Sequence, residues 1–184
     1  MKDMEVIQTY IETQSPVCFR LLYQRYAGKV YSKCISLLKD EALAEDATQE
    51  IFTKIFMNVS KFAERSKFST WVYSITYNYC IDYLRKKNKQ KDLFSEDIEK
   101  APDVEDEVHD EVLLEMEVYQ LKQVLENLPA DDRMVLLMKY QDDMSIKEIA
   151  DALDKTESAI KMRIKRAKAK AQQIREEMFE EEYS

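Results

Sequence analysis

The sequence predicts an all-α protein of two small helical domains, joined by an acidic linker, the second of which contains a helix-turn-helix. The 184 residues include one Gly, three Pro and no Asn-Gly or Asp-Gly pair, which leaves almost nothing to form the tight turns of β-hairpins. Apolar residues instead recur at i, i+3, i+4 and i+7, the spacing that gives a helix one buried face. The length has room for one medium domain or two small ones.

Cap residues divide the first part of the chain into helices. A short helix is expected over 4–14. Ser15 at the N-cap and Pro16 in the first turn then start a helix that runs toward Leu38. Its expected buried side consists of Phe19, Leu22, Tyr23, Tyr26 and Val30. Gly28 lies inside this helix, where it is expected to let a neighbouring element pack closely.

Asp40 is expected to cap a third helix over 41–59. The core stripe of this helix consists of Ala44, Ala47, Ile51 and Ile55. Asp46, Gln49 and Glu50 stay on its polar side. Their chemistry alone indicates a solvated acidic patch, with the binding of a partner as the alternative.

After a loop over 60–67, a helix over 71–88 is expected, capped by Ser69 or Thr70 and rich in aromatic residues. Its rings fall on more than one face, so some of them should be exposed: Trp71, Tyr73, Tyr77, Tyr79 and Tyr83. A run of cations follows: Arg85, Lys86, Lys87, Lys89 and Lys91. Rings stack on unpaired bases and cations hold phosphates, so together they favour a single-strand binding site. Each Tyr taken alone favours core packing.

Asn78 and Asp82 lie four residues apart on one face of this aromatic helix, together with Trp71, Ile75 and Arg85. Their side chains could read base edges or only cap and solvate the helix.

A strongly acidic segment with no sustained helical period follows and is expected to be an extended linker over 92–110. Residues 92–117 hold 12 acidic residues against one Lys. By contrast, residues 1–91 hold 15 basic against 10 acidic residues, and residues 118–175 hold 12 against 9. The net charge of −8 therefore hides two mildly basic segments, residues 1–91 and 118–175, which lie within the two domains expected over 1–91 and 111–184.

The second domain is expected to begin with helices over 111–125 and 130–140, and a helix-turn-helix follows. Ser145 and Glu148 form a capping box, Asp154 suits a left-handed turn, and Thr156 caps the second helix. This helix buries Ile160, Ile164, Ala167 and Ala171. Its other faces carry Lys155, Lys161, Arg163, Lys165, Arg166, Lys168 and Lys170. A basic second helix after a tight turn is typical of a DNA major-groove reader, whereas the bland alternative is a solvated basic face.

The sequence contains none of the usual features of an enzyme. It has no Gly-rich phosphate loop, no nucleophile beside a base and no metal-spaced cluster, so no catalysis, cofactor or metal is expected. Cys18, Cys34 and Cys80 are expected to be core thiols rather than a disulfide or a metal site. No signal peptide and no apolar run long enough to span a membrane is present, which predicts a cytoplasmic protein.

The order and spacing of these segments resemble the small extracytoplasmic-function (ECF) sigma factors of bacterial RNA polymerase. AEDATQEIFTKIF resembles the segment that docks on the polymerase clamp, which implies that Asp46, Gln49 and Glu50 bind core polymerase. KFSTWVYSITYNYCIDYLRKK is similar to the part that melts and reads the minus-10 element. LPADDRMVLLMKYQ with the helix-turn-helix is similar to the minus-35 reader.

The resemblance also implies roles for individual residues. In the minus-10 region, it places Asn78 and Asp82 near the bases and Arg85 and Lys86 at the backbone, beside the aromatic Trp71. The groove-facing positions of the minus-35 reader are occupied by Ser158, Lys161, Met162, Lys165 and Arg166. Met162 departs from the family, in which a small polar residue is common at that position. The implied partners are core RNA polymerase, double-stranded and melted promoter DNA, and an anti-sigma factor.

Two other classes of protein compete with this interpretation. A helix-turn-helix repressor or activator would normally dimerise, and no heptad or symmetric interface is evident, so a monomer is expected. Such a regulator would also leave the aromatic and basic stretch over 71–91 unexplained. A helical adaptor without a nucleic-acid role would tolerate charge reversal at Lys165 and Arg166.

Overall fold

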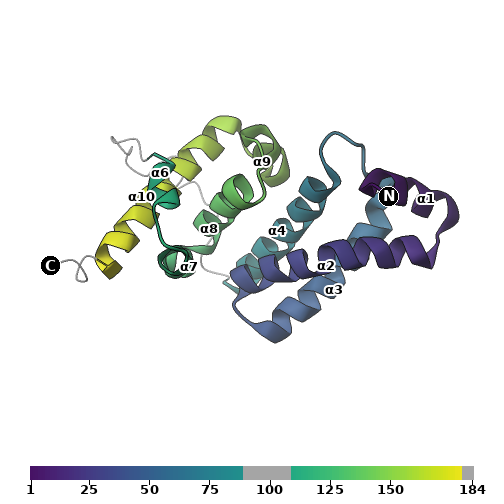
Figure 1. Cartoon of the computed structure of the whole chain (residues 1–184), viewed down its shortest axis with the longest axis horizontal. Helices are drawn as coiled ribbons and strands as arrows, with labels where there is room; N and C mark the ends of the chain where they lie inside the picture. The colour runs from purple at the N-terminus through teal and green to yellow at the C-terminus, as the bar shows by residue number, and fades with distance from the viewer. Residues whose placement is uncertain (89–108, 180–184) are drawn as a thin grey trace. The chain divides into compact units, whose positions relative to one another are not determined.

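The computed structural model describes residues 1–88 and 109–179, which fall into two compact units, Met1–Asn88 and Lys89–Ser184. Within these described ranges the chain forms helices and turns and no strand (Figure 1). The all-α fold class is therefore confirmed. The expected acidic linker over 92–110 lies outside the described residues except for its last two. None of the described helices has a stretch long and apolar enough to cross a bilayer.

The first unit consists of four α-helices and one 3-10 turn. These are α1 (Asp3–Thr13), α2 (Pro16–Leu38), α3 (Glu41–Asn58), η1 (Val59–Lys61) and α4 (Phe68–Lys87). The predicted caps form: Ser15 Oγ accepts from the N–H of Val17, and Asp40 Oδ1 accepts from the N–H of Leu43. α2 packs on both α3 and α4, around a core that includes Leu22, Val30, Ile51, Ile55 and Tyr77.

Two predicted core positions of α2 are wrong. Leu22, Tyr26 and Val30 are buried, but Phe19 and Tyr23 are 40% and 38% exposed. Their rings turn toward Phe52 and Phe56 of α3 at the rim of an open groove. The helical period identified the apolar stripe correctly, but it could not show that α1 and α3 leave part of that stripe uncovered.

Gly28 is exposed on α2, and a Cβ built there meets no atom within 4 Å. The expectation that it permits close packing is therefore wrong. Its φ is not positive, so nothing in the described part of the fold requires glycine at this position.

We expect Gly28→Ala to stabilise the first unit by about 0.5–1 kcal/mol, because Ala loses less backbone entropy in a helix. The measurement is the thermal unfolding midpoint of the full chain, with Gly28→Ser as the matched variant of lower helix propensity. The midpoint should be highest with Ala, intermediate with Ser and lowest with the wild-type Gly. A midpoint that falls with Ala would mean that a neighbour occupies the space beside Gly28.

The start of α4 and its aromatic residues differ in part from prediction. The helix begins at Phe68 after an N-cap at Lys67, so Ser69 and Thr70 lie inside the first turn and cap nothing. Tyr73 and Tyr77 are buried, whereas Trp71, Tyr79 and Tyr83 are partly exposed. The expectation that only some of the rings are exposed is confirmed.

All three cysteines are free and buried, as predicted for core thiols. Cys34 of α2 and Cys80 of α4 lie together, with 3.8 Å between their sulfur atoms. The thiols therefore help to fill the contact between these two helices.

The second unit begins with helices that are shorter than predicted. They are α6 (Glu111–Leu114), α7 (Val118–Asn127), α8 (Ala130–Leu136), a π-helical turn η2 (Leu137–Gln141), α9 (Ile146–Leu153) and α10 (Glu157–Phe179). The single helix expected over 111–125 is broken between α6 and α7, where Met116 turns inward and is buried. The apolar residues Leu114 and Val118 on either side of this break are more than four-fifths exposed, at 81% and 86%.

The helix-turn-helix forms as predicted from α9 and α10. Ser145 and Glu148 make the reciprocal capping box at 3.1 and 2.8 Å. Asp154 ends α9 with φ 52°, in the left-handed region. Thr156 Oγ1 then accepts from the N–H of Ala159 and starts α10. These local bonds fix the length of the turn, and α10 packs on both α8 and α9.

Candidate nucleic-acid interface

The face of α10 that the sequence predicted to read DNA is accessible in the structure. Ser158 and Lys161 are exposed, and Met162, Lys165 and Arg166 are partly exposed. The opposite stripe is buried as predicted: Ile160, Ile164, Ala167 and Ala171. Successive residues on a helix are about 100° apart, so the five predicted readers share one side of α10. A basic helix presented in this way can enter the major groove.

Three cations of α10 are held by aspartates of the same unit, which the sequence analysis did not predict. Arg163 forms ion pairs with Asp131 and, at 2.9 Å, with Asp132 at the start of α8. Lys170 contacts Asp132 at 2.7 Å, and Lys168 contacts Asp110 at 2.9 Å. The side chain of Arg163 is only 13% exposed, so its expected place on an open basic face is wrong.

Burial lowers the pKa of Arg163 to about 10, and the nearby positive charge of Arg166 contributes to this shift. The guanidinium of Arg163 still keeps its charge at neutral pH. The sequence contained one signal for this position: Arg163 directly precedes the core residue Ile164 and lies three residues after Ile160. A cation at the border of a buried stripe requires an acidic partner.

On α4, the predicted minus-10 residues lie along an accessible face. Asn78, Asp82 and Lys86 are exposed, while Arg85 is partly exposed and lies 3.6 Å from Asp82. Trp71 is partly exposed near the N-terminal end of the helix, where its ring contacts Phe62 and Phe68, with centroids 5.4 and 5.6 Å apart. The helix thus combines an accessible ring with polar and cationic side chains, a combination suited to unpaired bases and their phosphates.

On α3, Asp46, Gln49 and Glu50 are all exposed. Glu50 accepts a hydrogen bond from the hydroxyl of Tyr79 on α4 at 2.7 Å, and the Lys54 ammonium lies 4.9 Å from the centre of the same ring. Burial and this hydrogen bond to a carboxylate raise the pKa of the Tyr79 hydroxyl. Glu50 therefore ties α3 to α4, whereas no such tie is seen for Asp46 in the described part of the chain.

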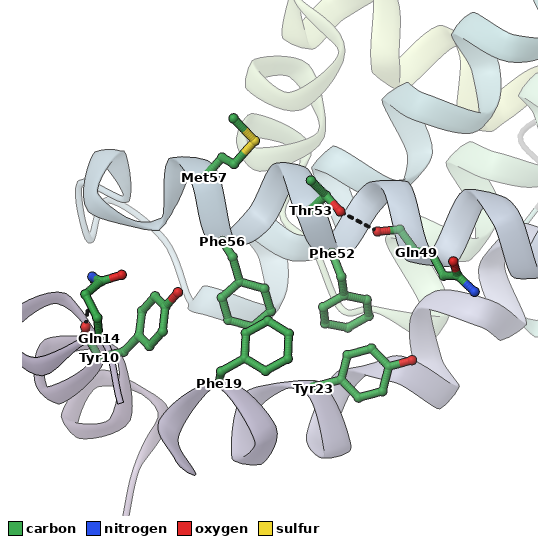
Figure 2. A pocket seen from close by; sticks show the side chains of 9 residues that line it. All are labelled: Tyr10, Gln14, Phe19, Tyr23, Gln49, Phe52, Thr53, Phe56 and Met57. Atoms are coloured by element: carbon green, nitrogen blue, oxygen red, sulfur yellow. Dashed lines mark hydrogen bonds between the residues drawn. The ribbon is translucent and has the colours of Figure 1, made fainter. Parts of the chain in front are cut away.

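An aromatic groove lies beside this polar surface, and sequence reasoning missed it. It has a volume of about 530 Å³ and runs between α1, α2 and α3 (Figure 2). The residues that line it are Tyr10, Gln14, Phe19, Tyr23, Gln49, Phe52, Thr53, Phe56 and Met57. Phe19 and Phe56 face each other with ring centroids 4.1 Å apart. Met57 at the rim is 76% exposed.

Comparison with known proteins gives the same division of the chain. The family model for Sigma-70 region 2 matches residues 22–90, and the model for Sigma-70 region 4 matches residues 119–170. The ECF RNA polymerase sigma factor SigW of Bacillus subtilis (strain 168) is 34% identical over 151 residues, which are 78% of this chain and 81% of that protein. The chain belongs to the ECF family of RNA polymerase sigma factors.

A second relative agrees with this assignment, and a solved structure shares the fold. ECF RNA polymerase sigma factor SigX of the same organism is 30% identical over 173 residues, which are 89% of each chain. The fold resembles that of CnrH, solved in complex with the cytosolic domain of CnrY, with a TM-score of 0.65 and 19% identity over 96% of this chain and 98% of that one. At that identity the likeness shows the fold alone.

Membership in the family identifies the general function. A sigma factor binds core RNA polymerase and promoter DNA and serves transcription initiation. The alternative of a helix-turn-helix repressor or activator is not favoured, because the same chain that contains the helix-turn-helix also matches region 2 of the family. A helical adaptor without a nucleic-acid role is not favoured either.

Proposed function

We propose that this ECF sigma factor directs core polymerase to promoters whose minus-35 element is read by residues 111–184 and whose minus-10 element is read by residues 1–91. The acidic segment over 92–110 connects the two. The observation that carries this proposal is the accessible cationic face of α10. This face belongs to the second helix of a helix-turn-helix, which is the helix that reads DNA in such motifs. The linker makes the second contact intramolecular, so neither domain needs to bind tightly alone.

At the minus-35 element, the N-terminal half of α10 lies in the major groove. Lys165 and Arg166 donate to phosphates or to the acceptor edges of guanine, while Ser158 and Lys161 add polar contacts. Met162 can contact only apolar groups such as the thymine methyl. Support comes from the exposure of these five side chains on one side of α10.

At the minus-10 element, α4 captures the unpaired strand. Asn78 and Asp82 contact base edges, Arg85 and Lys86 hold the backbone, and Trp71 offers a ring for stacking. Binding of the unpaired bases by α4 offsets part of the free-energy cost of unpairing them, which is a few kcal/mol per base. The protein then needs no catalytic group, metal or cofactor of its own.

Core polymerase docks on the exposed face of α3, with Asp46, Gln49 and Glu50 as contact residues. The aromatic groove supplies the apolar part of this surface, because Gln49 belongs to both and α3 runs from acidic residues at one end to Phe56 and Met57 at the other. The occupant that fits is an amphipathic helix of core polymerase with cations at one end and apolar side chains at the other. An anti-sigma factor that bound the free protein would cover the same surfaces and would therefore compete with core polymerase. The chain would act in the cytoplasm as a monomer.

The test is to combine the chain with core polymerase and map promoter opening by permanganate, which oxidises unpaired thymines. We expect reactive thymines confined to the minus-10 region, together with transcripts that require the chain. Core polymerase alone and the chain alone are the controls. Transcripts without sequence preference, or a chain that only blocks transcription by another holoenzyme, would contradict the proposal.

A further inference from the structure

Asp131 and Asp132 of α8 form a buried acidic pair beneath the reading helix. Their exposed fractions are 4% and 1%, although both are charged residues. Charged side chains are almost never buried to this extent unless they are paired. In the described part of the chain, both acids pair with cations of α10: Arg163 pairs with Asp131 and Asp132, and Lys170 pairs with Asp132.

These contacts fasten one edge of α10. Arg163 and Lys170 are seven residues apart, so they lie about two turns apart along the same side of the helix. That side lies between the buried stripe of Ile160 and Ala167 and the predicted reader Arg166. A single carboxylate, that of Asp132, thus contacts both cations, with Lys170 at 2.7 Å.

The opposite edge of α10 is fastened as well. Lys168 lies on the other side of the buried stripe and contacts Asp110, whose carboxylate also accepts from the Tyr140 hydroxyl. The two hydrogen bonds lower the pKa of Asp110, which keeps it ionised at neutral pH. An apolar stripe alone permits small rotations of a helix about its axis, whereas directional contacts at both edges oppose them.

We propose that Asp131, Asp132 and Arg163 are positioning residues for promoter reading, which set the rotation of α10 and thereby decide which side chains face the minus-35 bases. The inference rests on the proposed minus-35 role of α10. Arg163 suits this task because its planar guanidinium can contact two carboxylates at once, which a Lys ammonium does in a less directed way. Because Arg163 and Lys170 are paired with these aspartates, they are not available to contact DNA phosphates. Residues on the reading side make those contacts instead.

The test uses holoenzyme assembled from core polymerase and the full chain, on two templates that differ only in whether the minus-35 element is intact or scrambled. The variants are Asp132→Asn, Arg163→Met and Arg163→Lys, and Asp151→Asn on α9 removes one exposed acid as the matched control. The readout is the ratio of transcripts from the two templates, measured well below each variant's thermal unfolding midpoint. This ratio reports sequence discrimination, because a loss of folded protein lowers both transcripts together.

We expect Asp132→Asn and Arg163→Met to lower the ratio at least tenfold. Arg163→Lys, which keeps the charge and the fold, should lower it several-fold, and Asp151→Asn should change it less than twofold. A ratio that stays at the wild-type value in Arg163→Lys and Asp132→Asn would overturn the inference, as would an equal loss on both templates. If the wild-type chain itself fails to discriminate between the templates, the proposed minus-35 role fails instead.

Discussion

Lys165→Glu combined with Arg166→Glu is expected to lower transcription from an intact promoter at least about 100-fold. A well-placed side-chain contact to a base contributes about 1–3 kcal/mol, and the introduced carboxylates also repel the phosphates. A loss of 1.4 kcal/mol corresponds to a factor of ten, so two such contacts account for the expected size. The measurement is a transcription assay with purified core polymerase. Permanganate mapping on the same template would show whether promoter opening is lost together with transcription.

The matched control for this charge reversal is Lys122→Glu with Arg175→Glu. It makes the same change in charge within the second unit, on α7 and on the C-terminal half of α10. If the reading side is the N-terminal half of α10, the control should keep transcription within about threefold of wild type, since only long-range repulsion, which salt screens, remains. Equal losses in the two variants would show that net charge, and not the reading face, determines activity.

The helix boundaries that the sequence predicted correctly are those set by side chains close in sequence. Ser15, Asp40, the Ser145–Glu148 capping box and Thr156 all bond to a backbone N–H within three residues, and all of them cap as expected. Such caps need no information about the rest of the fold. The start of α4 shows the limit: its N-cap, Lys67, makes no side-chain cap bond, so the neighbouring Ser69 and Thr70 misled the prediction.

Features that depend on distant contacts could not be predicted in the same way. The ring of Phe19 meets that of Phe56, 37 positions away, and this contact creates a groove where the sequence suggested a closed core. Arg163 forms ion pairs within the second unit because Asp131 and Asp132 of α8 lie beneath it. A helical period marks the apolar stripe, but whether a neighbouring helix covers it is a property of the tertiary fold.

The arrangement on the first unit bears on how polymerase docking can be tested. Glu50 belongs to the predicted docking surface, but it also accepts the hydrogen bond from Tyr79 on α4. A substitution at Glu50 would therefore disturb the contact of α3 with α4 as well as the docking face. Asp46 and Gln49 are exposed on the same face of α3 and separate the two effects.

Asp46→Lys combined with Gln49→Lys is therefore expected to weaken binding to core polymerase at least about 100-fold. Truncating one partner of a buried charge pair typically costs about 2–5 kcal/mol and like-charge contacts add to this cost, whereas a 100-fold loss requires about 2.8 kcal/mol. Thermal unfolding of the free chain should stay near wild type, because surface substitutions away from packing contacts change stability by less than about 0.5 kcal/mol. The measurement is competition with labelled wild-type chain for core polymerase.

Gln8→Lys with Glu12→Lys on α1 is the matched control, since it makes the same change in charge at two exposed helical positions four residues apart. Binding should remain within about threefold of wild type in this control, because only screened, long-range repulsion is added.

Met57→Asp tests the apolar end of the surface. Its side chain is 76% exposed in the free chain, so a polar replacement costs the free fold little but removes an apolar contact from a filled groove. A tenfold loss with Met57→Asp would place the occupant in the groove, whereas normal binding by this variant together with failure of Asp46→Lys and Gln49→Lys would restrict docking to the polar face of α3. Normal binding by all of these variants would contradict docking on α3 altogether.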